Sequence, residues 1–201
     1  MSRRPDPERK PQLLSDILDY LADKPLSSVT FRAIADHLDV SAFAVVYHFG
    51  TKSNLVAEIV QAIGDRQRRG FGDIELNATS VDEYLEGIYR YWEWTLEPTN
   101  RYLHRLEVEA GMLQAIDHVP VGERSTLGGW YELVSEGLCE LGIPDDTARV
   151  EARAMVNIMY GFQYDLVLLG EIEATRQAFD AMVEVYRHRL TDLIERARAA
   201  T

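Results

Sequence analysis

Four polar side chains between residues 30 and 52 could bind the phosphate groups of a nucleic acid. Thr30, Tyr47 and His48 carry hydrogen-bonding groups, and Lys52 carries a positive charge. Contacts of this kind position a protein on a nucleic acid, whereas contacts with base edges select a sequence. Lys52 lies in the first turn of a predicted helix, where the helix dipole favours anions. A binding role would explain that placement, and so would simple solvation.

A helix-turn-helix pattern surrounds these side chains. Thr30 and Ser41 are good N-caps, and apolar residues recur at helical spacing after each of them. Asp39 fits the turn between the two helices, Gly50 permits the next turn, and Thr51 caps a further helix. This arrangement can place the second short helix in the major groove of DNA. Periodicity alone leaves ordinary amphipathic helices as an equal alternative.

A run of positions in this segment fits one motif in a fixed register. The matching residues are Thr30, Arg32, Ile34, Ala35, Val40, Ser41, Tyr47, His48, Phe49, Lys52 and Leu55. Together they resemble the N-terminal domain of the TetR family of transcriptional regulators, and the similarity covers about residues 12–60. The resemblance implies an all-α fold of about nine helices. It implies a three-helix DNA-binding domain over 1–50, a connecting helix over about 51–69, and an effector-binding and dimerisation domain over 70–201.

The resemblance also implies partners for this chain. A homodimer would bind double-stranded operator DNA, and a small, mostly apolar effector would release it, so that the protein would act as a repressor. Pairing makes physical sense, because one reading helix covers only a few base pairs and a symmetric pair reads two half-sites. The alternative is a helical, small-molecule-binding dimer that has lost specific DNA binding.

Two departures from the family pattern keep that alternative open. The family's tyrosine, which meets a phosphate, stands two positions before the histidine, but Val46 holds that place here and Tyr47 directly precedes His48. One helical position turns a side chain by about 100°, so whether Tyr47 replaces that contact stays open. Ala42 and Phe43 occupy positions that are often Lys and Gly in the family. A cation is therefore missing from the predicted reading helix.

The predicted DNA-binding residues combine the phosphate candidates with the reading helix. They are Thr30, Arg32, Ser41, Ala42, Phe43, Val46, Tyr47, His48 and Lys52. The reading helix contains no Arg, Asn or Gln, the side chains that pair bidentately with guanine or adenine. We therefore predict that sequence selection depends on thymine methyl groups and on DNA shape. The alternative is that Phe43 and Val46 face the protein core.

The charge of the chain is distributed unevenly. A net charge of −12 over 201 residues argues against nucleic acid when taken as a whole. Residues 1–70, however, contain 10 basic and 9 acidic residues, whereas residues 71–201 contain 11 and 24. The predicted DNA-binding part is therefore nearly neutral. Arg3, Arg4, Arg9 and Lys10 form a basic start that could reach DNA or serve only as a solubilising tail.

Compartment and membrane association follow from composition. The single cysteine, Cys139, cannot form an intrachain disulfide, which fits a reducing cytoplasm. No apolar run approaches the length that spans a membrane, and the charged, proline-containing start lacks the apolar core of a signal peptide. We expect a soluble, cytoplasmic protein without a membrane partner.

Helical spacing continues through the remainder of the sequence. A first helix is predicted over 8–23, and later ones over 81–96 and 100–116. Another is predicted to end at 142, and two more run over 145–170 and 174–198. Ser80 and Glu83 form a capping-box pattern. The last two helices carry apolar stripes, to which the resemblance gives a part in a four-helix dimer interface. The interface candidates are Met155, Leu166, Phe179, Met182, Tyr186 and Leu190, and the alternative is burial within one subunit.

Large amphipathic side chains gather in the second region. Apolar walls with a few polar tips suit a ligand pocket, and the resemblance favours that interpretation over simple aromatic core packing. The candidate effector-pocket residues are Tyr89, Trp92, Tyr102, Met112, Trp130, Met159 and Phe162.

The sequence predicts no catalytic residues, no metal and no cofactor. A di-metal site in a helical bundle needs two Glu-x-x-His repeats. His104 and Glu107 have the reverse order, and Glu184 and His188 are four apart and unrepeated. Neither a glycine-rich phosphate loop nor a Gly-x-Ser-x-Gly elbow is present. We therefore predict a binding protein rather than an enzyme.

Overall fold

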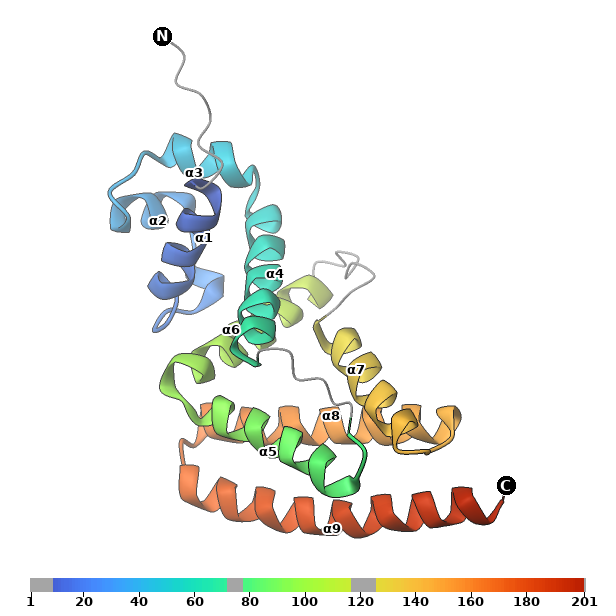
Figure 1. Cartoon of the computed structure of the whole chain (residues 1–201). Helices are drawn as coiled ribbons and strands as arrows, with labels where there is room; N and C mark the ends of the chain where they lie inside the picture. The colour runs from blue at the N-terminus through green and yellow to red at the C-terminus, as the bar shows by residue number, and fades with distance from the viewer. Residues whose placement is uncertain (1–8, 72–77, 117–125, 201) are drawn as a thin grey trace. The chain divides into compact units, whose positions relative to one another are not determined.

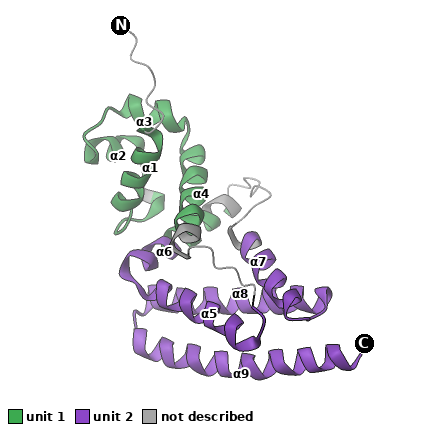
Figure 2. Cartoon of the chain, viewed as in Figure 1, with its two compact units in different colours: residues 1–67, 105–121 green, residues 68–104, 122–201 purple. Residues whose placement is uncertain are grey.

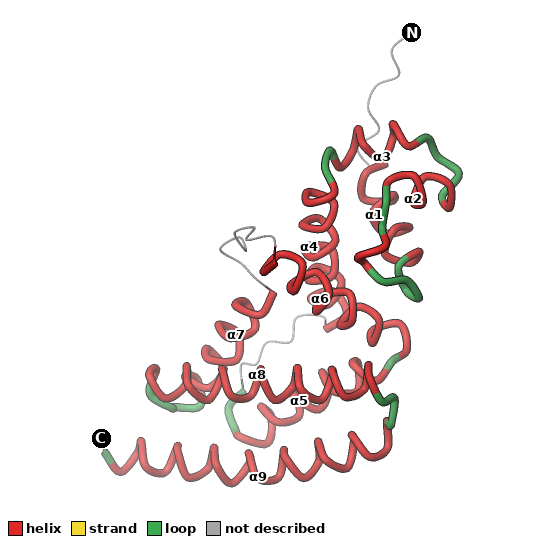
Figure 3. The backbone as a smooth tube through the Cα atoms, turned by 180° about the vertical axis from the view of Figure 1, so that it is seen from behind, coloured by secondary structure: helices red, strands yellow, loops and turns green. Residues whose placement is uncertain are grey.

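The computed structural model describes residues 9–71, 78–116 and 126–200, and every regular element in these ranges is a helix (Figures 1 and 3). The predicted all-α class is confirmed. The elements are α1 (Arg9–Tyr20), the 3-10 turn η1 (Leu26–Ser28), α2 (Phe31–His37), α3 (Ala42–Phe49), α4 (Lys52–Phe71), α5 (Val81–Leu96), α6 (Pro98–Ile116), α7 (Thr126–Glu140), α8 (Asp145–Leu168) and α9 (Ile172–Ala199).

The chain divides into two compact units (Figure 2). Unit 1 comprises residues 1–67 and 105–121, and unit 2 comprises 68–104 and 122–201. This division differs from the expected boundary, because the second part of α6 groups with the N-terminal helices. The reason is packing that crosses a long stretch of sequence, which no local pattern reveals.

The core of unit 1 is formed by the apolar faces of five helices. The buried side chains are Leu13, Ile17, Leu18, Leu21, Leu26, Val29, Ile34, Ala35, Val45, Phe49, Leu55, Val56, Ile59, Ile63, Leu106 and Ala110. The turn between α2 and α3 is closed by the Val40 amide, which donates to the Ala35 carbonyl at 3.0 Å. Asp39 takes a positive φ of 51° in that turn, as predicted for a residue type that tolerates the left-handed region.

A buried contact attaches the second part of α6 to the end of α1. The Arg105 guanidinium donates to the carbonyls of Leu21 at 2.6 Å, Ala22 at 3.2 Å and Lys24 at 3.0 Å. Arg105 also pairs with Glu109 on its own helix. Helix carbonyls at a C-terminus lack intrahelical partners, and Arg105 supplies donors to three carbonyls just after α1. The Leu21 carbonyl also accepts from the Lys24 amide at 3.2 Å.

Unit 2 packs α7 against α8, and α5 and α8 against α9. Its centre is an aromatic cluster. The Trp92 ring stacks on Phe179 with centroids 4.5 Å apart, and Phe162 meets both rings edge-on at 5.8 and 5.9 Å. Tyr89 meets Phe179 edge-on at 5.3 Å. These offset and edge-on geometries are the ones that aromatic pairs favour.

Local signals set most helix boundaries correctly. Ser80 caps α5 by accepting from the Glu83 amide at 3.3 Å. The Glu83 carboxylate accepts from the Thr79 amide and hydroxyl at 2.8 and 2.7 Å, rather than from Ser80, and these bonds lower the pKa of Glu83. α6 starts at Pro98, two residues earlier than predicted, since proline suits the first turn of a helix. Within the described ranges, none of the helices combines the length and apolarity that crossing a bilayer requires.

Candidate nucleic-acid interface

Helix α3 is fixed to unit 1 by one face and both ends. Val45 and Phe49 are buried, and they hold the helix against its neighbours. Ser41 accepts from the Ala44 amide at 3.1 Å and caps the start, as predicted. At the other end Gly50 has a φ of 69°, and a Cβ there would lie 3.3 Å from the Asn54 side chain. A glycine is therefore required at this turn.

The opposite face of α3 is exposed and apolar. Phe43 is 77% exposed, Val46 42% and Tyr47 65%, and Ser41 and Ala42 are also exposed. The alternative that Phe43 and Val46 face the core is therefore ruled out. Large apolar side chains gathered on one exposed surface mark a contact site for a partner.

The phosphate candidates differ in the hydrogen bonds that their side chains already make. Thr30 accepts from the Ala33 amide at 3.1 Å and caps α2. The Lys52 ammonium donates to the Ser27 carbonyl at 3.1 Å, which leaves it further donors because an ammonium carries three. His48 is half-buried, and Arg32 is exposed. The roles of these residues in DNA contact stay predictions.

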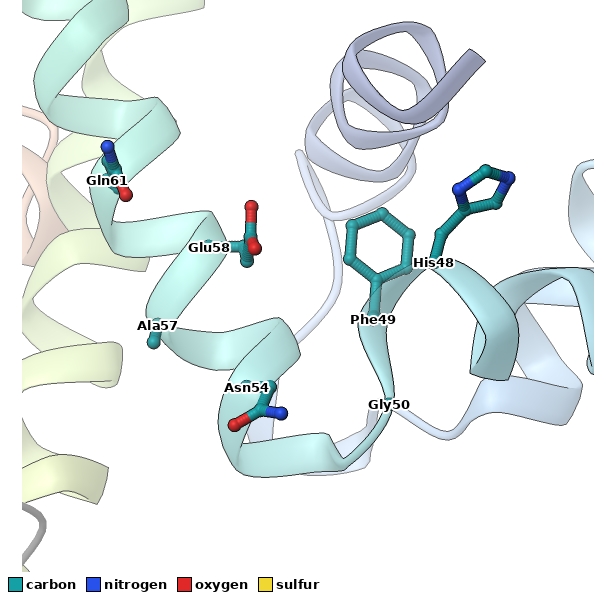
Figure 4. Close-up of a pocket in the computed structure, with 7 residues that line it drawn as sticks. All are labelled: His48, Phe49, Gly50, Asn54, Ala57, Glu58 and Gln61. Carbon is teal, nitrogen blue, oxygen red and sulfur yellow. The ribbon is translucent and has the colours of Figure 1, made fainter. Parts of the chain in front are cut away.

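A shallow groove lies between the end of α3 and α4. It is lined by His48, Phe49, Gly50, Asn54, Ala57, Glu58 and Gln61, and Figure 4 draws these side chains. The Lys10 ammonium donates to Glu58 at 2.5 Å and lies 5.8 Å from the Phe49 ring centroid. Lys10 therefore links the first turn of α1 to α4. Of the predicted basic start, Arg3 and Arg4 lie outside the described residues.

The structure separates the candidate effector-pocket residues into two sets. Trp92 and Met159 are buried, and Tyr89, Trp130 and Phe162 are half-buried, all in the aromatic interior of unit 2. Tyr102, also in unit 2, is half-buried, whereas Met112 belongs to unit 1 and is 63% exposed. None of the seven lines the groove beside α3, and none lines a second groove in unit 2, which Thr79, Thr191 and Arg198 help to form. Their role in ligand binding stays a prediction.

A buried amide lies beside these aromatic rings, at a position where the sequence favoured solvent exposure. Gln163 is only 2% exposed, and its Nε2 donates to the Tyr91 hydroxyl at 2.5 Å, while its Oε1 has no hydrogen-bond partner. The signal was present in the sequence, because Gln163 lies four residues after Met159 and three before Leu166 on the apolar stripe of α8.

The candidate dimer-interface residues face the interior of their own subunit. Five are buried and Met182 is half-buried, and the buried ones are Met155, Leu166, Phe179, Tyr186 and Leu190. They pack in the core of unit 2, so the predicted interface needs correction. The physical reason is that α8 and α9 turn their most apolar stripes inward, where the other helices of the unit cover them.

Both helices also carry exposed apolar side chains outside these buried stripes. On α8 the exposed apolar side chains include Val150, Ile158 and Leu168, at 66%, 40% and 61% exposure. On α9 the Val185 side chain is 70% exposed, and Ala178 and Ala181 lie on the same side of the helix.

Among the residues that the structure describes, no cluster of three or more His, Cys, Asp or Glu side chains is suitable for a metal ion. His104 lies among aromatic rings, with centroids 6.1 Å from Trp94 and 6.5 Å from Tyr91 and from Tyr160.

Known proteins are similar to this chain in sequence and in fold. Residues 13–59 match the family model of bacterial regulatory proteins, tetR family. The HTH-type transcriptional repressor KstR2 of Mycolicibacterium smegmatis is 24% identical over 135 residues, which is 66% of this chain and 66%, just under two thirds, of that protein.

Two solved structures have a similar fold. A transcriptional regulator from Rhodococcus sp. Rha1 superposes with a TM-score of 0.65 at 19% identity, over 95% of this chain and 96% of that one. A TetR variant from Acinetobacter baumannii in complex with minocycline superposes with a TM-score of 0.51 at 17% identity, over 98% of each chain.

Proposed function

Because this chain belongs to the TetR family of DNA-binding transcriptional regulators, we propose that it binds operator DNA as a homodimer, represses transcription, and is released by a small, mostly apolar effector. Its site of action would be the cytoplasm, where bacterial DNA lies. The observation that carries the proposal is the exposed face of α3, which a capped, anchored helix presents outside the core of unit 1.

The DNA contact divides into positioning and selection. Thr30, Arg32, Tyr47, His48 and Lys52 would meet phosphates, whereas Ser41, Ala42, Phe43 and Val46 would meet base edges. Arg32 and Lys52 supply the cations that α3 lacks. Tyr47 is 65% exposed and therefore accessible to a phosphate.

Binding to DNA is tested by its dependence on salt. Sequences that the protein selects from a random duplex pool should bind more weakly as salt rises, because neutralised phosphates release counterions. Lys52→Gln should weaken binding to all sequences and reduce the slope of log affinity against log salt by about 1. Tyr47→Phe should weaken binding without changing that slope, since a hydroxyl carries no charge.

Failure of that test has a definite meaning. If no duplex binds in a salt-dependent way, the chain is a ligand-binding protein that has lost DNA recognition. The apolar α3 face without Arg, Lys, Asn or Gln is the observation that favours this second candidate.

Dimerisation is supported by the exposed apolar face of α8 and α9. Val150, Ile158 and Leu168 on α8, with Ala178, Ala181 and Val185 on α9, offer apolar and small side chains that a second copy could cover. Val185→Glu should convert the dimer to a monomer in sedimentation experiments. The matched control is Thr191→Glu, an exposed position on another side of α9, and it should leave the dimer intact. A monomeric parent protein would contradict the proposal.

Release by an effector is supported by the course of α6. Its residues 98–104 belong to unit 2, and its residues from Arg105 onward belong to unit 1, where Arg105 holds the end of α1. A ligand that binds one arrangement of α6 more tightly than another would shift the population of DNA-binding molecules. The similar TetR variant is known in complex with minocycline, so minocycline is a suitable first probe beside mostly apolar compounds. A mobility-shift titration with such a panel should yield a compound that releases DNA.

A further inference from the structure

The exposed face of α3 has almost no hydrogen-bonding capacity toward bases. Between residues 41 and 49, the side chains with polar groups are Ser41, Tyr47 and His48. The Ser41 hydroxyl already accepts from the Ala44 amide at 3.1 Å. His48 and Tyr47 are at the far end of the helix, next to Phe49, and are the phosphate candidates.

What remains on this face is an ordered apolar surface. Phe43 and Tyr47 are one turn apart, and their ring centroids lie 6.4 Å from each other with an interplanar angle of 29°. Tyr47 in turn meets the His48 ring edge-on at 5.2 Å. Rings that pack on each other lose little side-chain freedom when a partner arrives, so this surface is preorganised.

The base edges of the major groove offer one apolar feature. Thymine presents its C5-methyl group there beside its O4 acceptor, whereas guanine, adenine and cytosine present hydrogen-bond donors and acceptors without a methyl group. An apolar side chain pressed against a donor or acceptor leaves that group without a partner, which is costly. Pressed against a methyl group, it removes apolar surface from water, which is favourable.

We propose that Phe43 and Val46, supported by the stacked Tyr47 ring, select thymine at defined operator positions through its C5-methyl group. This inference rests on the proposed function, because it concerns how the same helix reads DNA. Phe43 is the principal reader, since it is the most exposed of the three and lies in the first turn of α3. Val46, 42% exposed, lies one turn later on the same side.

The test replaces thymine by deoxyuridine, which lacks only the C5-methyl group. Starting from the sequence selected out of a random pool, each thymine of a half-site is replaced in turn and the dissociation constant is measured. At thymines read by α3, affinity should fall about fourfold for each methyl removed, as expected for one buried methyl-sized group. Replacement of thymines outside the half-sites should change nothing.

Protein variants assign the effect to its residue. In Phe43→Ala, the ratio of thymine to uracil affinity at the principal position should fall to about one, whereas Phe43→Leu, which keeps an apolar side chain, should retain most of it. The matched control is Ile116→Ala, because Ile116 is 71% exposed in the same unit but lies on α6. That variant should bind both duplexes like the parent protein.

The outcomes separate this inference from the proposed function. Salt-dependent, sequence-specific binding that is indifferent to every thymine-to-uracil replacement would overturn the reading of methyl groups and leave the regulator intact. A selected operator whose half-sites contain no thymine under α3 would also overturn it. Absence of DNA binding under all conditions would overturn both.

Discussion

Large apolar side chains occur both on α3 and in the centre of unit 2, and their surroundings differ completely. On α3, Phe43 is 77% exposed and Tyr47 65%. In unit 2, Phe179 and Trp92 are fully buried and stack on each other. The same kind of residue therefore supports two functions. Rings that other helices cover stabilise the fold, whereas rings that nothing in the described chain covers are available to a partner.

The two regions also differ in how polar groups are used. On α3 and its neighbours, hydroxyls such as those of Thr30 and Ser41 serve as caps at the protein surface. In unit 2, Gln163 is buried with one amide atom unpaired. A buried polar atom without a partner costs stability, so the aromatic interior of unit 2 carries a cost that the capped helix starts avoid.

The difference between the two regions is tested most directly by removing one aromatic ring from each and comparing the losses of stability. Phe179→Ala should lower the free energy of unfolding by about 3–5 kcal/mol, because it empties a packed aromatic cluster. Phe43→Ala should change it by no more than about 0.5 kcal/mol, because the ring is exposed. Urea unfolding at fixed protein concentration measures both, and equal losses would contradict the distinction.

A smaller effect is expected at the attachment of α6 to α1. Arg105→Ala should destabilise the protein by about 1–3 kcal/mol, since it removes the guanidinium donors from the carbonyls of Leu21, Ala22 and Lys24. Hydrogen exchange should accelerate at the amides of α1. The control is Arg149→Ala, which removes an exposed ion pair with Asp145 and should cost little. Unchanged exchange in α1 would show that Arg105 does not hold this helix.

The two serine caps allow a matched comparison of the units. Ser41→Ala and Ser80→Ala should each lower stability by about 1 kcal/mol, because each removes one acceptor from a helix start. Only Ser41→Ala should also weaken DNA binding, since Ser41 begins the reading helix. If Ser80→Ala weakened DNA binding to the same extent, the loss would reflect general stability rather than the site.

The smallest effect concerns the ion pair between Glu93 on α5 and Arg176 on α9. The Arg176 guanidinium bonds to the Glu93 carboxylate and lowers the pKa of Glu93. The pair therefore stabilises the protein above the ordinary glutamate pKa, and this contribution is lost as the pH falls through the lowered value. Both side chains are partly exposed, so the contribution is about 0.2–1 kcal/mol. Arg176→Gln should flatten the pH dependence of the unfolding midpoint in the acid range.

Much of the molecule could be predicted because its signals are local. Thr30, Ser41 and Ser80 cap the helices that their positions indicated. The motif that runs from Thr30 to Leu55 lies within the segment that the family model matches. The role of Arg105 was not predictable, since its partners on α1 lie more than eighty residues earlier in the sequence.

The sequence by itself determined most helix boundaries to within a few residues, the turn that joins α2 to α3, and the family motif. Caps, turn residues and helical periodicity act within a few residues, so they can be recognised without a structure. Only the tertiary structure decided which side of each helix is covered. Phe43 and Val46 face outward, whereas Phe179 and Leu190 face inward. Burial depends on neighbours distant in sequence, and one apolar stripe cannot reveal whether its own subunit or a partner covers it.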